Sequence, residues 1–225
     1  MYYLDHSLHF DNGRSAEIPA GKVVCVGLNY RDHISEMGSQ AASEPVLFMK
    51  PSTALASLEK PVAIPVAYGA CHHEAEMAVL IGEQLTECTE QQAEDAIVGV
   101  GVALDLTLRE LQAQFKQKGL PLDKAKGFDG ACAASAFVER AKVPDLQDVQ
   151  IRLTLNGEVR QESNTRLMIT PVPQLLAYIS RFFTLMPGDI VLTGTPAGVG
   201  PLVPGDQLTV ELVDLISVST SVVAR

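Results

Sequence analysis

The sequence has little positive charge, no long hydrophobic run and no closely spaced pair of cysteines. Its 17 lysines and arginines are outnumbered by 27 aspartates and glutamates, which gives a formal net charge of -10. Bulk electrostatics therefore argue against binding of nucleic acid or of an anionic membrane, although a small anion can still bind in a locally basic pocket. No apolar run approaches the roughly 20 residues that cross a bilayer, so no membrane partner is expected.

The cysteines and the first residues point to a reducing compartment. Cys25, Cys71, Cys88 and Cys132 are widely scattered and form no C-x-x-C pair, which favours free thiols over disulfides. The chain starts without a basic region followed by an apolar core, so a secretory signal is not expected. We therefore predict a soluble, cytoplasmic protein.

The composition indicates one globular unit with a sizeable core. Hydrophobic residues make up 47% of the chain and charged residues 20%, and 225 residues suffice for one generous domain or two small ones. No linker, low-complexity segment or internal repeat divides the sequence. We predict a strand-rich α+β domain over residues 21–225, with few short helices, preceded by a β-hairpin extension over residues 1–20.

Two dipeptides predict tight hairpin turns. Asn12-Gly13 lies in the proposed first hairpin, and Asn156-Gly157 lies between β-compatible segments at 150–155 and 158–162. Asn and Gly adopt the left-handed conformations that two-residue hairpin turns require. Further strands are expected at 22–27, 46–50, 97–104, 190–192, 207–213 and 216–223.

Helix signals are short and local. Thr89-x-x-Gln92 and Thr107-x-x-Glu110 predict capping boxes, and the second helix should end at Gly119. A helix over 29–38 would bring His33 and Glu36 onto one face. Thr170-Pro171 predicts another helix start. The apolar face expected for that helix consists of Leu175, Leu176, Ile179, Phe182 and Phe183.

The stretch His-His-Glu-Ala-Glu-Met-Ala-Val-Leu-Ile-Gly at 72–82 organises the rest of the chain. Its second half predicts a buried strand. Glu74 and Glu76 are two positions apart, so on a strand they point to one face, roughly 6 to 7 Å apart. Adjacent carboxylates entering a buried strand repel each other unless a cation lies between them, and oxygen ligands favour Mg²⁺ or Mn²⁺. The alternative is a strand end that frays, with both side chains in solvent.

Polar residues at other strand ends add chemistry, and each has an ordinary structural explanation. Asp105 can ligate a metal or help start a helix, and the His33–Glu36 pair can be a solvent-exposed helix pair. Arg109 and Lys126 can be surface charges. The loop at 193–200, Thr-Gly-Thr-Pro-Ala-Gly-Val-Gly, can be a tight connection, and it lacks the lysine of a nucleotide-binding P-loop.

As a set, these residues predict an enolate-forming metal site. Glu74, Glu76 and Asp105 would give a divalent cation three oxygen ligands. His33, oriented by Glu36, could take a proton from a nearby water. The side chains suited to stabilising a developing oxyanion are Arg109, Gln112 and Lys126. Backbone amides and hydroxyls around Gly194 and Thr195 could hold a substrate carboxylate.

Five motifs in order make the chain resemble the fumarylacetoacetate hydrolase family, specifically its short, single-domain acylpyruvate hydrolase group. The match covers almost everything from Lys22 onward. The motifs are Val-Gly-Leu-Asn-Tyr-x-x-His-x-x-Glu-Met (26–37), Pro-x-Leu-Phe-x-Lys-Pro (45–51), His-x-Glu-x-Glu-x-Ala-Val-x-Ile-Gly (72–82), Asp-x-Thr-x-Arg (105–109) and Gly-Asp-x-x-x-Thr-Gly-Thr-Pro-x-Gly-Val-Gly (188–200).

The resemblance implies a mixed β-sheet roll, a homodimer and a role for each matching residue. It implies Mg²⁺, with Mn²⁺ or Ca²⁺ as substitutes. The implied metal ligands are Glu74, Glu76 and Asp105, the implied water-activating dyad is His33 and Glu36, and the implied oxyanion-stabilising residues are Arg109, Gln112 and Lys126. Lys50 and Thr195, with Gly194 beside it, match residues that line the substrate site.

The implied reaction is hydrolysis of a C–C bond in an acylpyruvate, such as fumarylpyruvate or acetylpyruvate, with a pyruvate enolate leaving at the metal. The alternative is oxaloacetate decarboxylation or keto–enol tautomerisation at the same site, and a non-catalytic relative is a third possibility. All enzymatic versions take a small 2-keto acid. The segment 38–44, rich in small and polar residues, is expected to close over the site as a lid.

Overall fold

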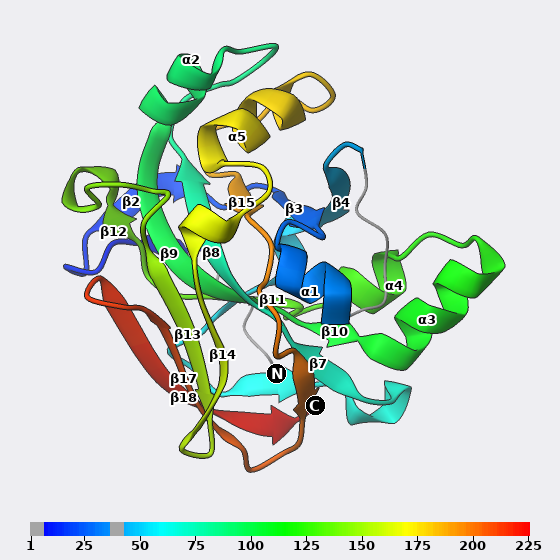
Figure 1. Ribbon diagram of the computed structural model, residues 1–225. Coiled ribbons are helices and arrows are strands. Elements are labelled where there is room, and N and C mark those ends of the chain that lie inside the picture. Colours follow the sequence, from blue (N-terminus) through cyan, green and yellow to red (C-terminus); the bar gives the residue numbers. More distant parts are fainter. Residues whose placement is uncertain (1–6, 37–42) are drawn as a thin grey trace.

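The computed structural model describes residues 7–36 and 43–225 and forms a curled, strand-rich body with short helices at its edges (Figure 1). The predicted α+β class and mixed-sheet roll are therefore confirmed. Most of the expected lid, residues 38–42, lies outside the described residues. Within the described ranges, every helix is too short or too polar to cross a membrane.

The central sheet has eight strands and is mixed. Strand β15 runs parallel to β3, and β11 runs parallel to β5, while the other pairs are antiparallel. Its two longest strands, β8 and β9, are buried on both faces, as the apolar runs at 77–81 and 97–104 predict. In spatial order the strands are β4 (Val46–Lys50), β3 (Val23–Gly27), β15 (Ile190–Leu192), β8 (Ala75–Ile81), β9 (Ile97–Asp105), β11 (Cys132–Ala134) and β5 (Leu55–Ser57), and β12 (Val138–Glu139) pairs with β9.

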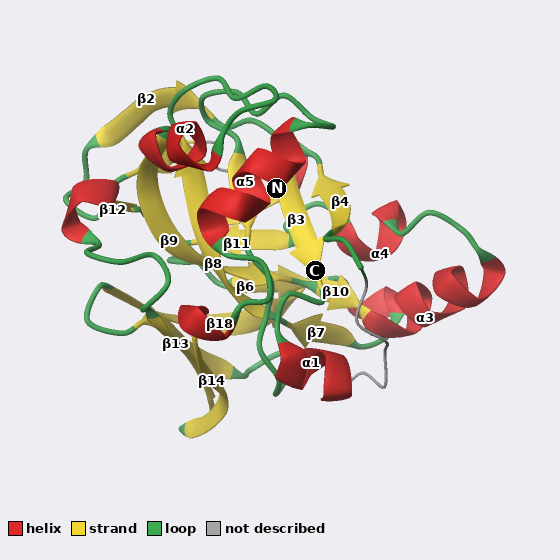
Figure 2. Ribbon diagram, turned by 45° about the horizontal axis from the view of Figure 1, so that its top comes forward, coloured by secondary structure: helices red, strands yellow, loops and turns green. Residues whose placement is uncertain are grey.

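Smaller sheets surround the central one (Figures 1 and 2). A five-stranded sheet lies across β8 and β9, and its strands β13 and β17 alternate buried and more exposed residues. Its strands in order are β14 (Glu158–Asn164), β13 (Gln150–Leu155), β17 (Gln207–Leu212), β18 (Ile216–Ala224) and β6 (Val62–Ile64). The others comprise β10 (Thr107–Leu108), β7 (Cys71–His73) and β16 (Gly200–Leu202), and the hairpin of β1 (Ser7–His9) with β2 (Ser15–Pro19).

Two apolar clusters cover the two faces of the central sheet. The larger one joins the sheet to the five-stranded sheet and to α5, through residues such as Met77, Val102 and Leu153. The smaller one places Leu8 and Phe10 of the first hairpin against the opposite face. The alternation of side chains along each central strand supplies both clusters at once. The expected hairpins are confirmed, with Gly13 and Gly157 at positive φ.

The helices are α1 (Arg31–Glu36), α2 (Glu90–Asp95), α3 (Arg109–Lys118), α4 (Asp123–Lys126) and α5 (Val172–Ser180), and the 3₁₀ turns are η1 (Ser52–Ala54), η2 (Val66–Tyr68), η3 (Arg140–Lys142) and η4 (Thr165–Leu167). The capping box of Thr89 and Gln92 is confirmed at α2. The box predicted at Thr107 is wrong, because Thr107 pairs with His72 in β10 and its hydroxyl donates to the Asp105 carbonyl. Helix α3 ends at Gly119 in the left-handed conformation, as expected.

Helix α5 is shorter than its apolar pattern suggests. It begins at Val172, with Pro171 at the capping position instead of inside the first turn, and it ends at Ser180. Its buried face retains three of the expected residues, Leu175, Leu176 and Ile179. Phe182 lies beyond the helix and is 61% exposed, so its assignment to the apolar face is wrong. Apolar periodicity continued past the point at which the backbone turns away.

Candidate active site

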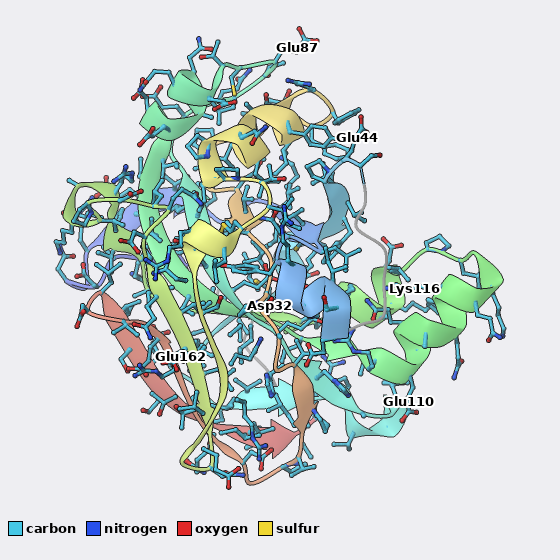
Figure 3. All side chains as sticks on the ribbon, viewed as in Figure 1. Asp32, Glu44, Glu87, Glu110, Lys116 and Glu162 are labelled. Carbon is cyan, nitrogen blue, oxygen red and sulfur yellow. The ribbon has the colours of Figure 1, made fainter. Side chains whose placement is uncertain are left out.

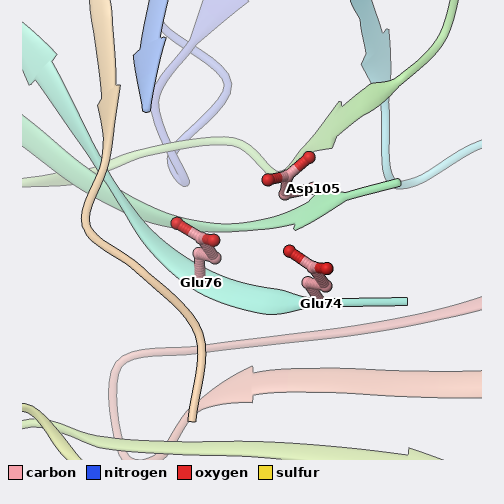
Figure 4. A group of neighbouring side chains, drawn as sticks. All are labelled: Glu74, Glu76 and Asp105. Atoms are coloured by element: carbon pink, nitrogen blue, oxygen red, sulfur yellow. The ribbon is translucent and has the colours of Figure 1, made fainter. Parts of the chain in front are cut away.

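Three buried carboxylates converge where β8 and β9 meet (Figure 4). Glu74 lies between β7 and β8, Glu76 lies on β8, and Asp105 is the last residue of β9. Antiparallel pairing of β8 with β9 brings Asp105 opposite Glu74, and the Asp105 N–H donates to the Glu74 carbonyl at 2.9 Å. Oxygen atoms of the three side chains lie within 4.8 Å of one another. The exposed, frayed alternative is wrong, because all three residues are at most 5% exposed.

Three cations surround these carboxylates. Lys126 of α4 donates to Glu74 Oε2 at 2.9 Å and to Asp105 Oδ2 at 2.7 Å. Lys50, at the end of β4, places its ammonium 2.7 Å from Asp105 Oδ1. The Arg109 guanidinium pairs with Glu74 Oε1. The surface-charge explanation therefore fails for Lys126, which is 4% exposed.

The carboxylates differ in their pKa values because their charged neighbours differ. Burial raises the pKa of Glu74, but the positive charges of Lys126 and Arg109 outweigh this effect and lower the pKa to about 2. Burial, and then the negative charges of Asp105 and Glu74, raise the pKa of Glu76 well above its usual value. Burial would lower the pKa of Lys126, but Asp105 and Glu74 raise it above its usual range. Without a bound cation, the protonated form of Glu76 is therefore more favoured than that of an ordinary carboxyl group.

The carboxylate cluster fits a hard divalent cation. It supplies only oxygen donors, which Mg²⁺ and Mn²⁺ prefer, and the three residues that carry them are at most 5% exposed. Burial and the negative charges of Asp105 and Glu74 raise the pKa of Glu76, and a bound cation would offset both effects. Glu74, Glu76 and Asp105 are thus the described residues that could hold a metal.

The predicted dyad forms on α1. His33 Nδ1 lies 3.2 Å from Glu36 Oε2, and His33 is 6% exposed, so the pair is not the solvent-exposed pair of the alternative explanation. The other carboxylate oxygen, Glu36 Oε1, accepts the Gly198 N–H at 2.9 Å. When Nδ1 carries the proton toward Glu36, Nε2 is left with a lone pair for a substrate or water.

Helix α3 presents the other predicted charge-stabilising groups. Arg109 is its first residue, and its guanidinium donates to Gln112 Oε1 at 2.7 Å while it also contacts Glu74. Gln112 is 6% exposed. The first turn of α3 therefore fixes a planar cation beside the carboxylate cluster, with its orientation set by two acceptors.

These groups line a cavity of about 100 Å³. Its polar and charged lining comprises His33, Glu74, Glu76, Asp105, Arg109, Gln112, Lys116, Lys126 and Thr195, and Val26, Leu28, Val46, Phe48 and Leu122 are among its apolar residues. The structure thus brings together residues from five separate sequence motifs. The site is small and combines charged with apolar lining residues.

Two residues predicted to bind substrate have different surroundings from those expected. Lys50 is completely buried and does not line the cavity; its ammonium pairs with Asp105 and donates to the Lys126 carbonyl. Gly194 donates its N–H to Glu76 Oε2 at 2.6 Å. Both residues thereby hold carboxylates of the cluster. Thr195 does line the cavity, as predicted.

Three further residues of the site were missed at the sequence level. Lys116 of α3, labelled in Figure 3, is among the residues that line the cavity. Asn29 uses its amide to bind the Thr193 carbonyl at 2.9 Å and the Thr170 backbone on the other side. Gln161 of β14 is completely buried. Asn29 lies in a recognised motif, which was a usable signal, but Gln161 lies in a polar strand that gives none.

The structure thus combines a curled mixed sheet, a buried carboxylate cluster and a histidine–carboxylate pair beside that cluster. The model of the fumarylacetoacetate (FAA) hydrolase C-terminal family matches residues 22–223. The chain belongs to this family, and it is an enzyme, as the family resemblance predicted.

Similar proteins include enzymes of oxaloacetate and acylpyruvate chemistry. Oxaloacetate tautomerase YcgM of Escherichia coli (strain K12) is 53% identical over 203 residues, which cover 90% of this chain and 93% of that protein. The mitochondrial oxaloacetate tautomerase FAHD1 of Homo sapiens is 44% identical over 200 residues, with coverage of 89% and 90%. The structure of a Pseudomonas aeruginosa fumarylpyruvate hydrolase in complex with Mn²⁺ and pyruvate is 32% identical, with a TM-score of 0.92 and coverage of 100% and 98%.

Proposed function

We propose that the protein is a metal-dependent oxaloacetate tautomerase, which interconverts the keto and enol forms of oxaloacetate. The carrying observation is the similarity of nearly the whole chain, at 53% and 44% identity, to oxaloacetate tautomerases, together with the converged site described above. Acylpyruvate hydrolysis was the first expectation from the motifs. The similar fumarylpyruvate hydrolase is less identical, at 32%, which favours oxaloacetate tautomerisation over acylpyruvate hydrolysis.

The charges of the site favour a small dianion. Three carboxylates face three cations, so a divalent metal brings an excess of two positive charges once Glu76 is ionised. A dianionic 2-keto acid restores neutrality, whereas a monoanion such as acetylpyruvate does not. The cavity of about 100 Å³ is small, as a short dianion such as oxaloacetate requires.

Tautomerisation needs a proton moved from carbon to oxygen, and the chain supplies a group for it. His33, with its Nδ1 proton held by Glu36, offers Nε2 to take the proton from the carbon between the keto and distal carboxylate groups. The electron pair of the C–H bond forms the C=C bond, and the π electron pair of the carbonyl moves to its oxygen, where Arg109 and Lys126 stabilise the negative charge. Return of the proton to that oxygen gives the enol, and no water is consumed.

A divalent cation held by Glu74, Glu76 and Asp105 would act as a Lewis acid toward the keto oxygen and the adjacent carboxylate. The chain contributes the position of that carboxylate through Thr195, which lines the cavity. Mn²⁺ is the ion found in the similar fumarylpyruvate hydrolase, and Mg²⁺ is our proposal for this protein.

The test follows three reactions in parallel with Mg²⁺ or Mn²⁺ present. Enol oxaloacetate is followed by its ultraviolet absorbance, pyruvate release by a coupled assay, and cleavage of acetylpyruvate and fumarylpyruvate by loss of their enol absorbance. We expect enol conversion to be fastest, and His33→Ala to slow it about 100-fold. The matched control is Asp32→Asn, at an exposed neighbouring position of α1, which should leave the rate unchanged (Figure 3).

Two outcomes would overturn the proposal. Faster cleavage of an acylpyruvate than conversion of oxaloacetate would restore the hydrolase reading. Pyruvate release as fast as enol loss would identify a decarboxylase.

A cytoplasmic location and a homodimer also remain predictions. Sedimentation that shows only a 24.1 kDa species would contradict the dimer.

A further inference from the structure

Gln161 is a completely buried amide on a strand whose other residues are exposed or partly exposed. It belongs to the five-stranded sheet, and it reaches the β7–β8 connection that carries Glu74. A primary amide offers two donor hydrogens and an acceptor oxygen with two lone pairs. All of this capacity is used by the site.

The partners fix the orientation of the amide. Gln161 Nε2 donates to the Pro196 carbonyl at 2.9 Å and to Thr195 Oγ1 at 2.8 Å, and its Oε1 accepts the Ala75 N–H at 3.0 Å. A carbonyl only accepts and a backbone N–H only donates, so the nitrogen and oxygen cannot be exchanged. His73 Nδ1 lies 3.0 Å from the same Oε1 and must therefore carry a proton.

Gln161 thereby joins the metal-ligand segment to the loop between β15 and β16. Ala75 lies between Glu74 and Glu76, and Thr195 and Pro196 lie in the loop. The same loop holds Glu76 through the Gly194 N–H, and it holds Glu36 of the dyad through the Gly198 N–H. One buried side chain therefore fixes the position of the metal-ligand segment relative to the loop that contacts Glu76 and Glu36.

The Thr195 hydroxyl is fully used inside this network. It donates its proton to the Ala75 carbonyl at 2.9 Å and accepts from Gln161. It therefore has no proton left for a substrate carboxylate. Within residues 7–36 and 43–225, the backbone N–H of Thr195 has no hydrogen-bond partner, and Thr195 lines the cavity.

We infer that Gln161 is a positioning residue that holds the Thr195 backbone N–H at the correct place to bind the carboxylate of a 2-keto acid beside the metal ligands. The inference rests on the proposed function for the nature of the ligand. It assigns carboxylate recognition to the Thr195 N–H instead of its hydroxyl. Gln161 acts through Thr195 and does not itself touch the substrate.

A double-mutant cycle tests this inference on the Mn²⁺-loaded protein. The variants are Gln161→Met, which keeps the length of the side chain without its polar atoms, Thr195→Val, which keeps the shape and the backbone N–H, and the combination of both. Isothermal titration calorimetry measures the Kd for oxalate, a planar mimic of a 2-keto acid enolate, at saturating Mn²⁺, and the Kd for Mn²⁺ alone.

We expect each single substitution to weaken oxalate binding about tenfold, which corresponds to the loss of one to two neutral hydrogen bonds. The combination should also weaken it about tenfold, not about 100-fold, because both substitutions break the same connection. Mn²⁺ affinity should change less than oxalate affinity. The matched control is Glu162→Gln, the exposed next residue of β14, which should change neither Kd.

Additive effects in the cycle would overturn the inference, as would an unchanged oxalate Kd in Gln161→Met. An equal loss of Mn²⁺ and oxalate affinity would show a general disruption and would also overturn it. If Gln161→Met does not fold by circular dichroism, Gln161→Glu replaces it, because Glu can donate at most one of the two hydrogen bonds. A wild type that binds oxalate but does not convert enol oxaloacetate would refute the proposed function alone.

Discussion

The central sheet and the five-stranded sheet treat charge in opposite ways. At the end of β8 and β9, five charged residues are nearly or fully buried, and each of them contacts an oppositely charged or hydrogen-bonding partner; they are Lys50, Glu74, Glu76, Asp105 and Lys126. Along β13 and β14, charged residues such as Arg152 and Glu162 pair with their side chains 32% and 47% exposed. Charged side chains are therefore buried in the central sheet and exposed to solvent in the five-stranded sheet.

The difference shows where the protein accepts a cost in folding free energy for the sake of function. An ion buried in a sheet loses its hydration, a cost of several kcal/mol that its partners must offset. An exposed pair loses little hydration and contributes about 0 to 1 kcal/mol. A fold with no use for the buried cluster gains by replacing it with apolar residues, so its presence points to chemistry. Four substitutions separate the two regions.

Asp105→Asn should have the largest effect, because it removes a charged ligand from the proposed metal site. We expect kcat/KM for enol oxaloacetate to fall about 1,000-fold, or ~4 kcal/mol of activation free energy. Mn²⁺ binding should weaken in the same variant, as measured by calorimetry. Asp148→Asn removes a carboxylate that is 59% exposed and serves as the control. Activity within tenfold of wild type would place the metal elsewhere.

Lys50→Met should come next, as a loss of stability. It leaves Asp105 Oδ1 without its buried cation, and we expect the free energy of unfolding of the metal-free protein to fall by about 3 kcal/mol. Added Mn²⁺ should restore part of the loss, because it returns positive charge to the cluster. Urea titrations with and without Mn²⁺ measure this, and Lys118→Met on the exposed side of α3 is the control. Equal loss in both variants would contradict a specific role for Lys50.

Glu76→Gln should stabilise the metal-free protein, with a dependence on pH. Burial and the charges of Asp105 and Glu74 raise the pKa of Glu76 in the folded state, so ionisation disfavours folding as the pH rises above the usual carboxyl range. Glu74 has the opposite sign: its pKa is lowered to about 2 from 4.5, so its contribution is lost as the pH falls between these values.

In EDTA at pH 8, Glu76→Gln should therefore have a higher Tm than wild type, by about 2 to 4 °C for each kcal/mol gained. The difference should shrink at pH 5, where Glu76 is protonated in both folded and unfolded chains to a larger extent. Scanning calorimetry at the two pH values measures it. A difference that does not change with pH would mean that packing, not ionisation, is responsible.

Glu162→Ala should have the smallest effect. Its carboxylate pairs with Arg152 at 2.8 Å on the outer face of the five-stranded sheet, and solvent screens the pair (Figure 3). We expect less than about 1 kcal/mol of change in the free energy of unfolding. Addition of 0.5 M salt should reduce the difference further. A loss as large as that of Lys50→Met would remove the contrast between the two sheets.

The elements that were predicted correctly have local causes. The turns at Asn12-Gly13 and Asn156-Gly157 and the capping box at Thr89 depend on residues next to one another in sequence. The box at Thr107 failed because β10 pairs with β7, a contact between segments distant in sequence that outweighed a local preference. The early end of α5 has a similar origin, since periodicity does not report where the chain turns.

The proposed site residues were selected in sequence because their chemical types, their spacing and their match to the family motifs carry the signal. Glu74 and Glu76 share a face on any strand, and His33 and Glu36 share one on any helix. Their surroundings could not be predicted in the same way. The burial of Lys50 under Asp105 and the contact of Glu36 with Gly198 join residues 55 or more positions apart. The sequence around Gln161 contains no pattern that indicates a buried residue of the site.

Residue types and local spacing predicted the hairpins and many of the strands, and together with the family motifs they selected the proposed ligands and dyad. The tertiary structure decided which charges neutralise one another, how the pKa values of Glu74 and Glu76 shift, and which backbone N–H groups contact Glu36 and Glu76. These properties depend on burial and on distances between segments that meet only after folding. A carboxylate in sequence has no fixed pKa or partner, because both arise from the low-dielectric surroundings that the folded chain creates.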